Sequence, residues 1–380
     1  MRSLFDKFIS VPHRSFHENS ANIMSFRQLE NCRFGLIKTS FGLTQPKLSY
    51  NYEHIYRSNM WITPAPQSSG IYQETALPRI DKLVETIDSF GKKNLKILEI
   101  GGGNTFIAEQ ISNRFKNVHI TCLDPSYSTK TINESIKLIS GFFPTDLQNQ
   151  KFDLIFCFNT LEHIPDSTSF LKALNEFLVE TGLLVISFPE SSKQIANGDW
   201  NLFSQQHVNY FIAPFFFDYF EKYDLKILDY VVQYDEAIVT CRKPPKEQKI
   251  SQLFGGFDSI SSSAEIDLRF LNNFNAISDL LLSNKANLDR FFVHGATAGI
   301  LNIVSNMKNA EFFWDNLQII DNDSIKHGKY LSGFRNQVFP LYQVKSQPLS
   351  VLIATSTFSN EIKKSWLDRF YGENIKFYLV

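Results

Sequence analysis

The sequence has few cysteines and lacks a long hydrophobic run. None of its four cysteines belongs to a Cys-x-x-Cys pair or to a Cys/His cluster of the kind that binds zinc. We therefore expect free thiols, as in the reducing cytoplasm, and no metal site. Even the Phe-rich stretch 210–219 is shorter than the roughly 18 to 20 apolar residues that span a bilayer, and Glu221 and Lys222 follow it. We expect no membrane span and a cytoplasmic location.

Neither sign of charge dominates the chain, which has 38 Lys and Arg residues against 39 Asp and Glu residues. The net charge of −1 provides no overall field that would hold a nucleic acid or an acidic membrane surface. A disordered chain is also excluded, because 43% of the residues are hydrophobic. At roughly 150 residues per domain, the length predicts a globular protein of two or three domains.

Short apolar runs alternate with helical segments between residues 95 and 243. This alternation predicts parallel strands joined by crossover helices, which is an α/β fold. The last two runs are separated only by Asp235 and Glu236, so we expect an antiparallel hairpin at one edge of the sheet. The expected strands are Leu95–Ile100, His119–Asp124, Ser135–Ser140, Asp153–Asn159, Gly182–Phe188, Leu225–Tyr234 and Ala237–Arg242.

Composition divides the rest of the chain around this core. Residues 1–74 show no sustained hydrophobic period and predict a small irregular lobe. An amphipathic helix opens a core of residues 75–243, and a stretch rich in Pro, Gly and Ser at 244–264 is typical of a linker. Residues 265–380 predict a second, smaller α/β domain, in which the strand Phe291–Val293 runs into His294–Gly299 and a helix.

The sequence Glu99-Ile100-Gly101-Gly102-Gly103 ends a buried strand just before a helix. Glycine at such a turn lets a ligand lie against the backbone. Asp124 closes the next strand, twenty-three residues after Gly101, where a carboxylate can accept both hydroxyls of a ribose. Since Phe106 replaces the third glycine of the dinucleotide fingerprint, we expect a nucleoside without a pyrophosphate, such as S-adenosylmethionine.

Further candidates follow the third, fourth and fifth strands. Phe142 or Phe143 could stack on an adenine, and packing in the core is the equal alternative for both. Asn159 and His163 follow the fourth strand, where side chains face the ligand crevice of such sheets. His207, beyond the fifth strand, is the favoured general base, because its ordinary pKa lies near neutrality.

The Glu-x-Gly-x-Gly turn resembles motif I of the class I S-adenosylmethionine-dependent methyltransferases. The run 152–166, with its Leu-Glu-His-Ile at 161–164, resembles motif IV of the same superfamily. In that fold the seventh strand is inserted antiparallel to the others, as the expected hairpin suggests. The resemblance implies a seven-stranded Rossmann-like core with S-adenosylmethionine as cofactor, held by Glu99, Gly101–Gly103, Asp124, Phe142, Phe143 and Asn159.

A narrower resemblance is to the C-methyltransferases that act on nucleotide-linked 4-keto deoxysugars. It rests on His207–Phe211, His294–Ala298, Ile319–Asp323 and Lys326–Gly333. It implies a nucleotide sugar as partner and a role in glycan precursor or polysaccharide biosynthesis, with the C-terminal domain helping to hold the nucleotide sugar. By resemblance His207 is the base, His163 assists, and Tyr56 reaches the site from an N-terminal lobe.

The chain departs from that family at several positions. Ser204 and Gln206 replace a Tyr and a Glu, and a Gln cannot titrate. Only Cys32 lies near the place of the four zinc cysteines of the N-terminal lobe, and Gly299 stands where the family has a lysine. Two alternatives stay open: an O-methyltransferase acting on a sugar or small-molecule hydroxyl, and a catalytically silent scaffold that binds cofactor or nucleotide sugar. A nicotinamide-dependent reductase is disfavoured, because the third glycine of the dinucleotide fingerprint is missing.

Overall fold

The computed structural model divides the chain into two compact units, which are described one at a time. The large-sheet unit comprises Leu43–Glu190 and Val208–Asp258, and the small-sheet unit comprises Met1–Gly42, Ser191–His207 and Ser259–Val380. Most of the predicted N-terminal lobe, including Tyr56, and most of the predicted linker lie outside the described residues. The structure describes residues 10–12, 16–17, 26–28, 36–38, 70–91, 94–103, 105–127, 131–147, 150–204, 207, 209–212, 217, 220–245, 263–331, 333–356 and 358–379.

The large-sheet unit is built on an eight-stranded sheet of order β12-β13-β10-β9-β5-β6-β8-β7. Its strands are β5 (Leu95–Ile100), β6 (Val118–Leu123), β7 (Thr131–Asn133), β8 (Ile136–Ile139), β9 (Phe152–Phe158), β10 (Leu178–Pro189), β12 (Lys226–Gln233) and β13 (Glu236–Arg242). A further short strand, β11 (Asn209–Phe211), forms a parallel bridge to the residue after β10. The helical elements are α2 (Gly70–Ser89), α3 (Phe106–Arg114), η3 (Leu161–His163) and α4 (Ser167–Phe177).

The strands of the large sheet are parallel except at its two edges. β8, β6, β5, β9 and β10 pair in parallel, and β13 pairs antiparallel with both β10 and β12. The predicted antiparallel hairpin at the sheet edge is therefore confirmed, with its second strand inserted next to β10. The sequence did not predict β7, whose three residues are all exposed and pair antiparallel with β8.

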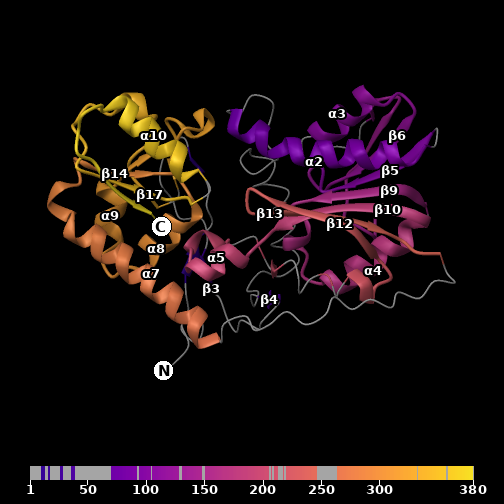
Figure 1. Ribbon diagram of the computed structural model, residues 1–380, viewed down its shortest axis with the longest axis horizontal. Coiled ribbons are helices and arrows are strands. Elements are labelled where there is room, and N and C mark those ends of the chain that lie inside the picture. Colours follow the sequence, from indigo (N-terminus) through magenta and orange to yellow (C-terminus); the bar gives the residue numbers. More distant parts are fainter. Residues whose placement is uncertain are drawn as a thin grey trace. The chain divides into compact units, whose positions relative to one another are not determined.

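Burial explains why the central strands are so apolar. All seven residues of β9 are buried, because helices lie on both faces of the sheet: α2 and α3 on one face and α4 on the other (Figure 1). In α2 the side chains of Leu83, Val84 and Ile87 join the core, as their spacing predicts. Leu77, which the same three- and four-residue spacing places on that apolar face, is instead 51% exposed.

The small-sheet unit contains a four-stranded parallel sheet of order β15-β14-β17-β18. Helices lie on both of its faces, α10 on one and α8 on the other (Figure 1). Its strands are β1 (Ser10–Pro12), β2 (Phe16–His17), β3 (Phe26–Gln28), β4 (Leu36–Lys38), β14 (Phe291–His294), β15 (Gln318–Ile320), β16 (Tyr330–Leu331), β17 (Ser350–Ile353) and β18 (Lys376–Leu379). Its helices are α5 (Ser192–Asn197), η4 (Trp200–Leu202), α7 (Ser263–Ser283), η5 (Lys285–Asn287), α8 (Ala298–Asn306), α9 (Ala310–Asn316), η6 (Ser324–Lys326), η7 (Leu341–Gln343) and α10 (Ser359–Arg369).

One boundary differs from the sequence analysis. Residues 191–207 were assigned to the first domain, but in the structure they belong to the small-sheet unit. Here α5 packs against α7, and η4 packs against α8. The chain therefore leaves the large-sheet unit after β10 and returns to it before β11. Among the helices of the described residues, none combines the length and apolar character needed to cross a membrane.

Candidate active site

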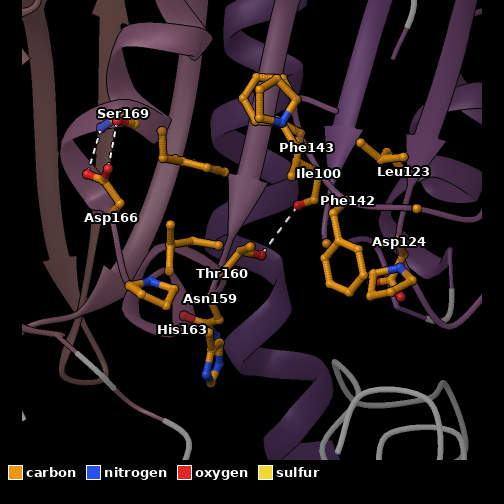
Figure 2. A pocket seen from close by; sticks show the side chains of 17 residues that line it. Ile100, Leu123, Asp124, Phe142, Phe143, Asn159, Thr160, His163, Asp166 and Ser169 are labelled. Atoms are coloured by element: carbon orange, nitrogen blue, oxygen red, sulfur yellow. Dashed lines mark hydrogen bonds between the residues drawn. The ribbon is translucent and has the colours of Figure 1, made fainter. Parts of the chain in front are cut away.

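A cavity of about 370 Å³ opens at the carboxyl ends of β5, β6 and β9 (Figure 2). Residues that the sequence analysis singled out from four separate segments meet there. Gly101 and Asp124 line it from the first two strands, Phe142 and Phe143 from the loop after β8, and Asn159 and His163 from the exit of β9. Parallel strands of this fold bind their ligands at this end, because the loops there diverge around a crevice.

The turn after β5 has no room for side chains. Gly101 has a φ of +74°, and a Cβ on it would lie 2.1 Å from the Thr160 hydroxyl oxygen. A Cβ on Gly102 would lie 2.6 Å both from the Glu99 carboxylate and from the Tyr127 hydroxyl. The predicted requirement for glycine therefore has two causes, the left-handed backbone at Gly101 and the crowding at Gly102.

Asp124 braces this turn. One carboxylate oxygen, Oδ2, accepts a hydrogen bond from the Gly103 N–H at 3.2 Å, and Oδ1 accepts one from the Ser126 N–H at 2.7 Å. These bonds fix the carboxylate at the cavity wall. A carboxylate has four lone-pair positions, so capacity remains for the hydroxyls of a ribose.

Glu99 lies beneath the turn and is not among the residues that line the cavity. Its side chain is buried, and burial raises its pKa to about 7. Within the described part of the chain, Glu99 Oε2 and the Tyr127 hydroxyl have no hydrogen-bond partner. Glu99 is thus placed below Gly102, one layer away from the cavity that Gly101 lines.

The two phenylalanines of the loop after β8 have different surroundings. Phe143 makes edge-on contacts with the rings of Phe170 and Phe177, each at a centroid distance of 5.2 Å. Phe142 is 39% exposed at the cavity. The sequence left base stacking and core packing open for both residues, and the geometry favours stacking for Phe142 and packing for Phe143.

The exit of β9 carries Asn159 in the left-handed region, with a φ of 47°. Its backbone N–H donates to the Ser187 carbonyl, and among the described residues its side-chain Oδ1 has no hydrogen-bond partner. The hydroxyl of Thr160, which the sequence analysis did not single out, donates to the carbonyls of Phe158 at 3.1 Å and of Ile100 at 3.4 Å. It thereby ties the exit of β9 to the end of β5 (Figure 2).

His163 ends the short helix η3, and its Nε2 lies 3.8 Å from Oε1 of the adjacent Glu162. Both side chains are buried, and burial raises the pKa of Glu162 to about 8. The turn is held by Asn209, whose side-chain amide donates to the carbonyls of Leu161 at 3.4 Å and Ile164 at 2.7 Å. This geometry holds the His163 side chain at the wall of the cavity.

Sequence reasoning missed the roles of Glu162, Asn209 and a buried ion pair. Arg79 of α2 donates two close hydrogen bonds to Glu236 of β13, at 2.6 and 2.8 Å. These two residues are 157 positions apart, so no local pattern announces their pairing. Glu162 lies in the Leu-Glu-His-Ile motif that pointed to His163. The same motif could therefore have drawn attention to Glu162.

The remaining predictions are distributed as follows. The Asp166 side chain accepts from the Ser169 N–H and is the N-cap of α4. His207 belongs to the small-sheet unit, where it is half-buried and its N–H donates to the Ser204 carbonyl at 3.2 Å. Tyr56 lies outside the described residues. The catalytic roles assigned to His207, His163 and Tyr56 stay predictions.

Asp321 and Asp323 follow β15 and bring two carboxylates close together, as a metal-binding loop would. Lys326 Nζ lies 2.9 Å from Asp321 Oδ2 and 3.9 Å from Asp323 Oδ2. An ammonium group therefore faces both carboxylates, and Asp321 also accepts from two backbone N–H groups. The geometry accounts for this loop as an ion-paired turn.

Comparison with known proteins gives a domain-level match. Residues 72–230 match the family described as "Methyltransferase domain". Malonyl-[acyl-carrier protein] O-methyltransferase 2 of Ilyobacter polytropus is 32% identical over 30% of this chain and 48% of its own length. Ubiquinone biosynthesis O-methyltransferase of Pasteurella multocida is 23% identical over 33% of this chain and 58% of its own. The chain thus spans about half the length of these curated relatives.

Solved structures include 1,6-didemethyltoxoflavin-N1-methyltransferase of Burkholderia thailandensis. It is 14% identical, covers 55% of this chain and 95% of its own, and superposes with a TM-score of 0.41. Magnesium protoporphyrin IX methyltransferase of Synechocystis covers 53% of this chain and 100% of its own at 12% identity and a TM-score of 0.40. These similarities are too low to bear on substrate.

The cofactor that this family implies is S-adenosylmethionine, and the residues present fit it. The crowded, side-chain-free turn at Gly101 and Gly102 leaves the backbone accessible, and the Asp124 carboxylate is fixed beside it. The buried, unpartnered Oδ1 of Asn159 adds an acceptor to the same edge of the sheet. The strand order and the antiparallel β13 match the predicted fold as well. Residues 72–230 therefore match a methyltransferase domain family and have the strand order expected of the class I, S-adenosylmethionine-dependent methyltransferase fold.

Proposed function

We propose that this protein transfers a methyl group from S-adenosylmethionine to a nucleotide-activated keto-deoxysugar or a related glycan precursor. The methyl-transfer part of the proposal rests on the cavity. Gly101 and Asp124 line it at the ends of β5 and β6, and His163 lines it beyond the end of β9. The nucleotide-sugar part is supported by the sequence motifs of residues 207–211 and of the C-terminal domain.

Each wall of the cavity has a distinct task in this proposal. S-adenosylmethionine supplies an electrophilic methyl group on a sulfonium. Asp124 accepts hydrogen bonds from the ribose, Phe142 covers the base, and Asn159 supplies an acceptor near the amino-acid moiety. Because Gly101 lacks a Cβ, the backbone of the turn approaches the ligand closely.

Methyl transfer also requires that the acceptor lose a proton. For a sugar carbon, a base removes the proton next to the keto group, and the resulting carbanion attacks the methyl group in line. We assign this task to His207. His163 is placed to hydrogen-bond the acceptor, because it lines the cavity and Glu162 lies next to its ring. Tyr56 is assigned to the acceptor side by the sequence motif alone.

Methylation of a hydroxyl group is the second candidate. Both curated relatives are named as O-methyltransferases. An alcohol needs only one base, so the replacement of the family's Tyr and Glu by Ser204 and Gln206 leaves this chemistry intact. Detection of a methyl ether in place of a carbon-bound methyl group in the product decides between the two candidates.

The glycine turn after β5 and the aspartate after β6 argue against a scaffold without activity. A chain released from catalysis would be expected to lose the glycine turn or its aspartate. Here a glycine turn at Gly101 and Gly102, braced by the fixed Asp124 carboxylate, supports nucleoside binding. The changes at Ser204, Gln206 and Gly299 relative to the sugar family leave Asp124 in place.

Calorimetric titration of the full chain with S-adenosylmethionine, S-adenosylhomocysteine and NADH tests the proposal first. We expect micromolar binding of the first two and no heat with NADH, because the turn lacks the third glycine that a pyrophosphate approach requires. Binding of NADH alone would contradict the methyltransferase assignment. Absence of binding for all three would favour the scaffold.

Incubation with S-adenosylmethionine and nucleotide sugars, followed by mass spectrometry, then identifies the acceptor by a gain of one methyl group. His207→Ala should lower turnover by about 10²- to 10⁴-fold and leave cofactor affinity unchanged. The matched control is His119→Ala, because His119 is exposed on β6. Full activity of His207→Ala would show that the base is another residue.

A further inference from the structure

The small-sheet unit contains the architecture of a nucleotide-binding crevice. In its parallel sheet the connections run to opposite sides of β14, so the carboxyl ends of β14 and β17 form the switch point at which such sheets bind ligands. The turn from His294 through Gly295 leads directly into α8, as in a phosphate-binding loop. The resemblance to the sugar methyltransferases has this domain help to hold the nucleotide sugar, and the contact described next removes this switch point, though not the rest of the domain, as its place.

A side chain of the protein itself bridges this switch point. Asn201 Oδ1 accepts a hydrogen bond from the Gly299 N–H in the first turn of α8, at 2.8 Å. Its Nδ2 donates to the Ala354 carbonyl just after β17, at 3.0 Å. Thr297 also donates its hydroxyl to the same carbonyl at 3.0 Å. The Asn201 amide thus uses the helix N–H that a phosphate would need and joins the two strand ends.

The identity of residue 299 follows from this contact. A Cβ on Gly299 would lie 2.7 Å from Asn201 Oδ1 and 2.8 Å from its Cγ. Any larger residue at this position would displace the amide. This crowding gives a physical reason for glycine at the position where the sugar family has a lysine.

The segment around Asn201 is held at several further points. Asn302, which is fully buried in α8, donates its Nδ2 to the carbonyls of Trp200 at 3.0 Å and Phe203 at 2.8 Å. The Trp200 indole N–H donates to the Phe270 carbonyl of α7 at 3.0 Å. The Asp199 side chain accepts from both the backbone N–H and the side-chain Nδ2 of Asn201, at 2.8 and 2.9 Å.

We propose that the small-sheet unit positions segment 198–204 through Asn201, and that its switch point takes this amide in place of a phosphate-bearing ligand. Asn201 is accordingly a positioning residue. The consequence for catalysis rests on the proposed function, since His207 follows Ser204 by three residues and bonds back to its carbonyl. The anchoring itself does not depend on that assignment.

Hydrogen exchange of the full chain, followed by mass spectrometry, tests the anchoring without any acceptor. In Asn201→Ala we expect amide exchange in residues 198–204 to accelerate by about tenfold, because three hydrogen bonds are lost. Peptides of β5, β6 and β9 should be unchanged. Gly299→Ala should have the same effect by displacing the amide, and the double variant should be no worse than either single variant.

Asn201→Asp serves as the harsher variant, since it retains an acceptor for the Gly299 N–H but brings a carboxylate oxygen against the Ala354 carbonyl and the Asp199 carboxylate. The matched control is Asn316→Ala, because Asn316 is exposed at the end of α9 and bonds only locally to Phe312. Exchange of residues 198–204 that stays at the wild-type rate in both Asn201→Ala and Gly299→Ala would overturn the proposal.

Titration of the wild-type protein with UDP and with inorganic phosphate separates this proposal from the proposed function. We expect neither to protect residues 294–302 from exchange. Protection of these residues by UDP would overturn the anchoring proposal and leave the methyltransferase proposal standing. Failure of S-adenosylmethionine to bind would have the opposite consequence. Once an acceptor is known, Asn201→Ala should lower kcat with the KM for S-adenosylmethionine unchanged.

Discussion

The two parallel sheets of this chain begin in the same way and end differently. Each has a strand, a glycine-containing turn and a helix, followed by a second strand that ends in an aspartate. Asp124 accepts from the N–H groups of Gly103 and Ser126. Asp321 accepts in the same manner from Ala296 and Asp323. The first edge opens into a cavity of about 370 Å³, and the second is bridged by Asn201.

This comparison shows that a glycine turn after a parallel strand does not by itself predict a ligand site. What decides is whether the protein's own polar groups already satisfy the edge. At the first edge, Asn159 and Glu99 retain side-chain oxygens that have no partner among the described residues. At the second, Lys326 pairs with Asp321 and an amide occupies the helix N–H, so that among the described residues His294 Nε2 is the atom of β14 left without a partner.

The largest expected effect comes from replacing each of the two aspartates by alanine in turn. Asp124→Ala should weaken S-adenosylhomocysteine binding by about 10²- to 10⁴-fold, since two hydrogen bonds to a charged group are worth about 3 to 6 kcal/mol. Asp321→Ala should leave that affinity unchanged and destabilise the small-sheet unit. Calorimetric titration measures the first effect and thermal unfolding the second. Equal loss of binding in both variants would show that the edges are not distinct.

The sequence predicted the large sheet well because its signals are local. The run from Leu95 to Ile100 is bounded by Asn94 and Gly101, and the observed strand has the same limits. Asp166 stands directly before the helix that begins at Ser167, and a cap of this kind can be recognised without tertiary information. Signals of this kind act within a few residues, so they survive in a single sequence.

What escaped prediction depends on long-range contacts. Asn201 and Gly299 are 98 positions apart, and nothing near either residue indicates the other. The transfer of residues 191–207 to the small-sheet unit depends on the same contacts. For β7, the cause is different. Its Thr131–Asn133 sequence has no buried face, so no hydrophobic pattern marks it.

The response to pH provides a second contrast between the units. Burial raises the pKa of Glu99 to about 7 and that of Glu162 to about 8, so the folded large-sheet unit binds protons more tightly than its unfolded chain. The two protonated glutamates therefore make their full contribution to the free energy of unfolding at pH values below the ordinary glutamate pKa. This contribution is lost as the pH rises through 7 to 8. The loss is on the order of 3 kcal/mol for Glu99.

The small-sheet unit should respond in the opposite direction. Burial lowers the pKa of His294 to about 4, and Lys326 with backbone N–H groups lowers the pKa of Asp321 although burial opposes this. Stability is then lost as the pH falls from 6.5 toward 4. Hydrogen exchange at pH values between 4.5 and 8 gives the free energy of unfolding of each unit, and its slope against pH tests both expectations.

Single variants sharpen the pH comparison. Glu99→Gln should flatten the slope of the large-sheet unit, and His294→Gln should flatten that of the small-sheet unit. Glu134→Gln and Glu361→Gln are matched controls, because both side chains are exposed. Slopes of the same sign in the two units would contradict the assignment of these buried groups.

The smallest expected effect concerns the two phenylalanines of the cofactor edge. Phe142→Ala should weaken S-adenosylmethionine binding by about tenfold, because an aromatic stacking contact is worth roughly 0.5 to 1.5 kcal/mol. Its melting temperature should change little, since the ring is 39% exposed. Phe143→Ala should do the reverse and cost about 1 to 3 kcal/mol of stability through its contacts with Phe170 and Phe177. The two adjacent residues are thus matched controls for each other, and only a ring that faces the ligand can change affinity without changing stability.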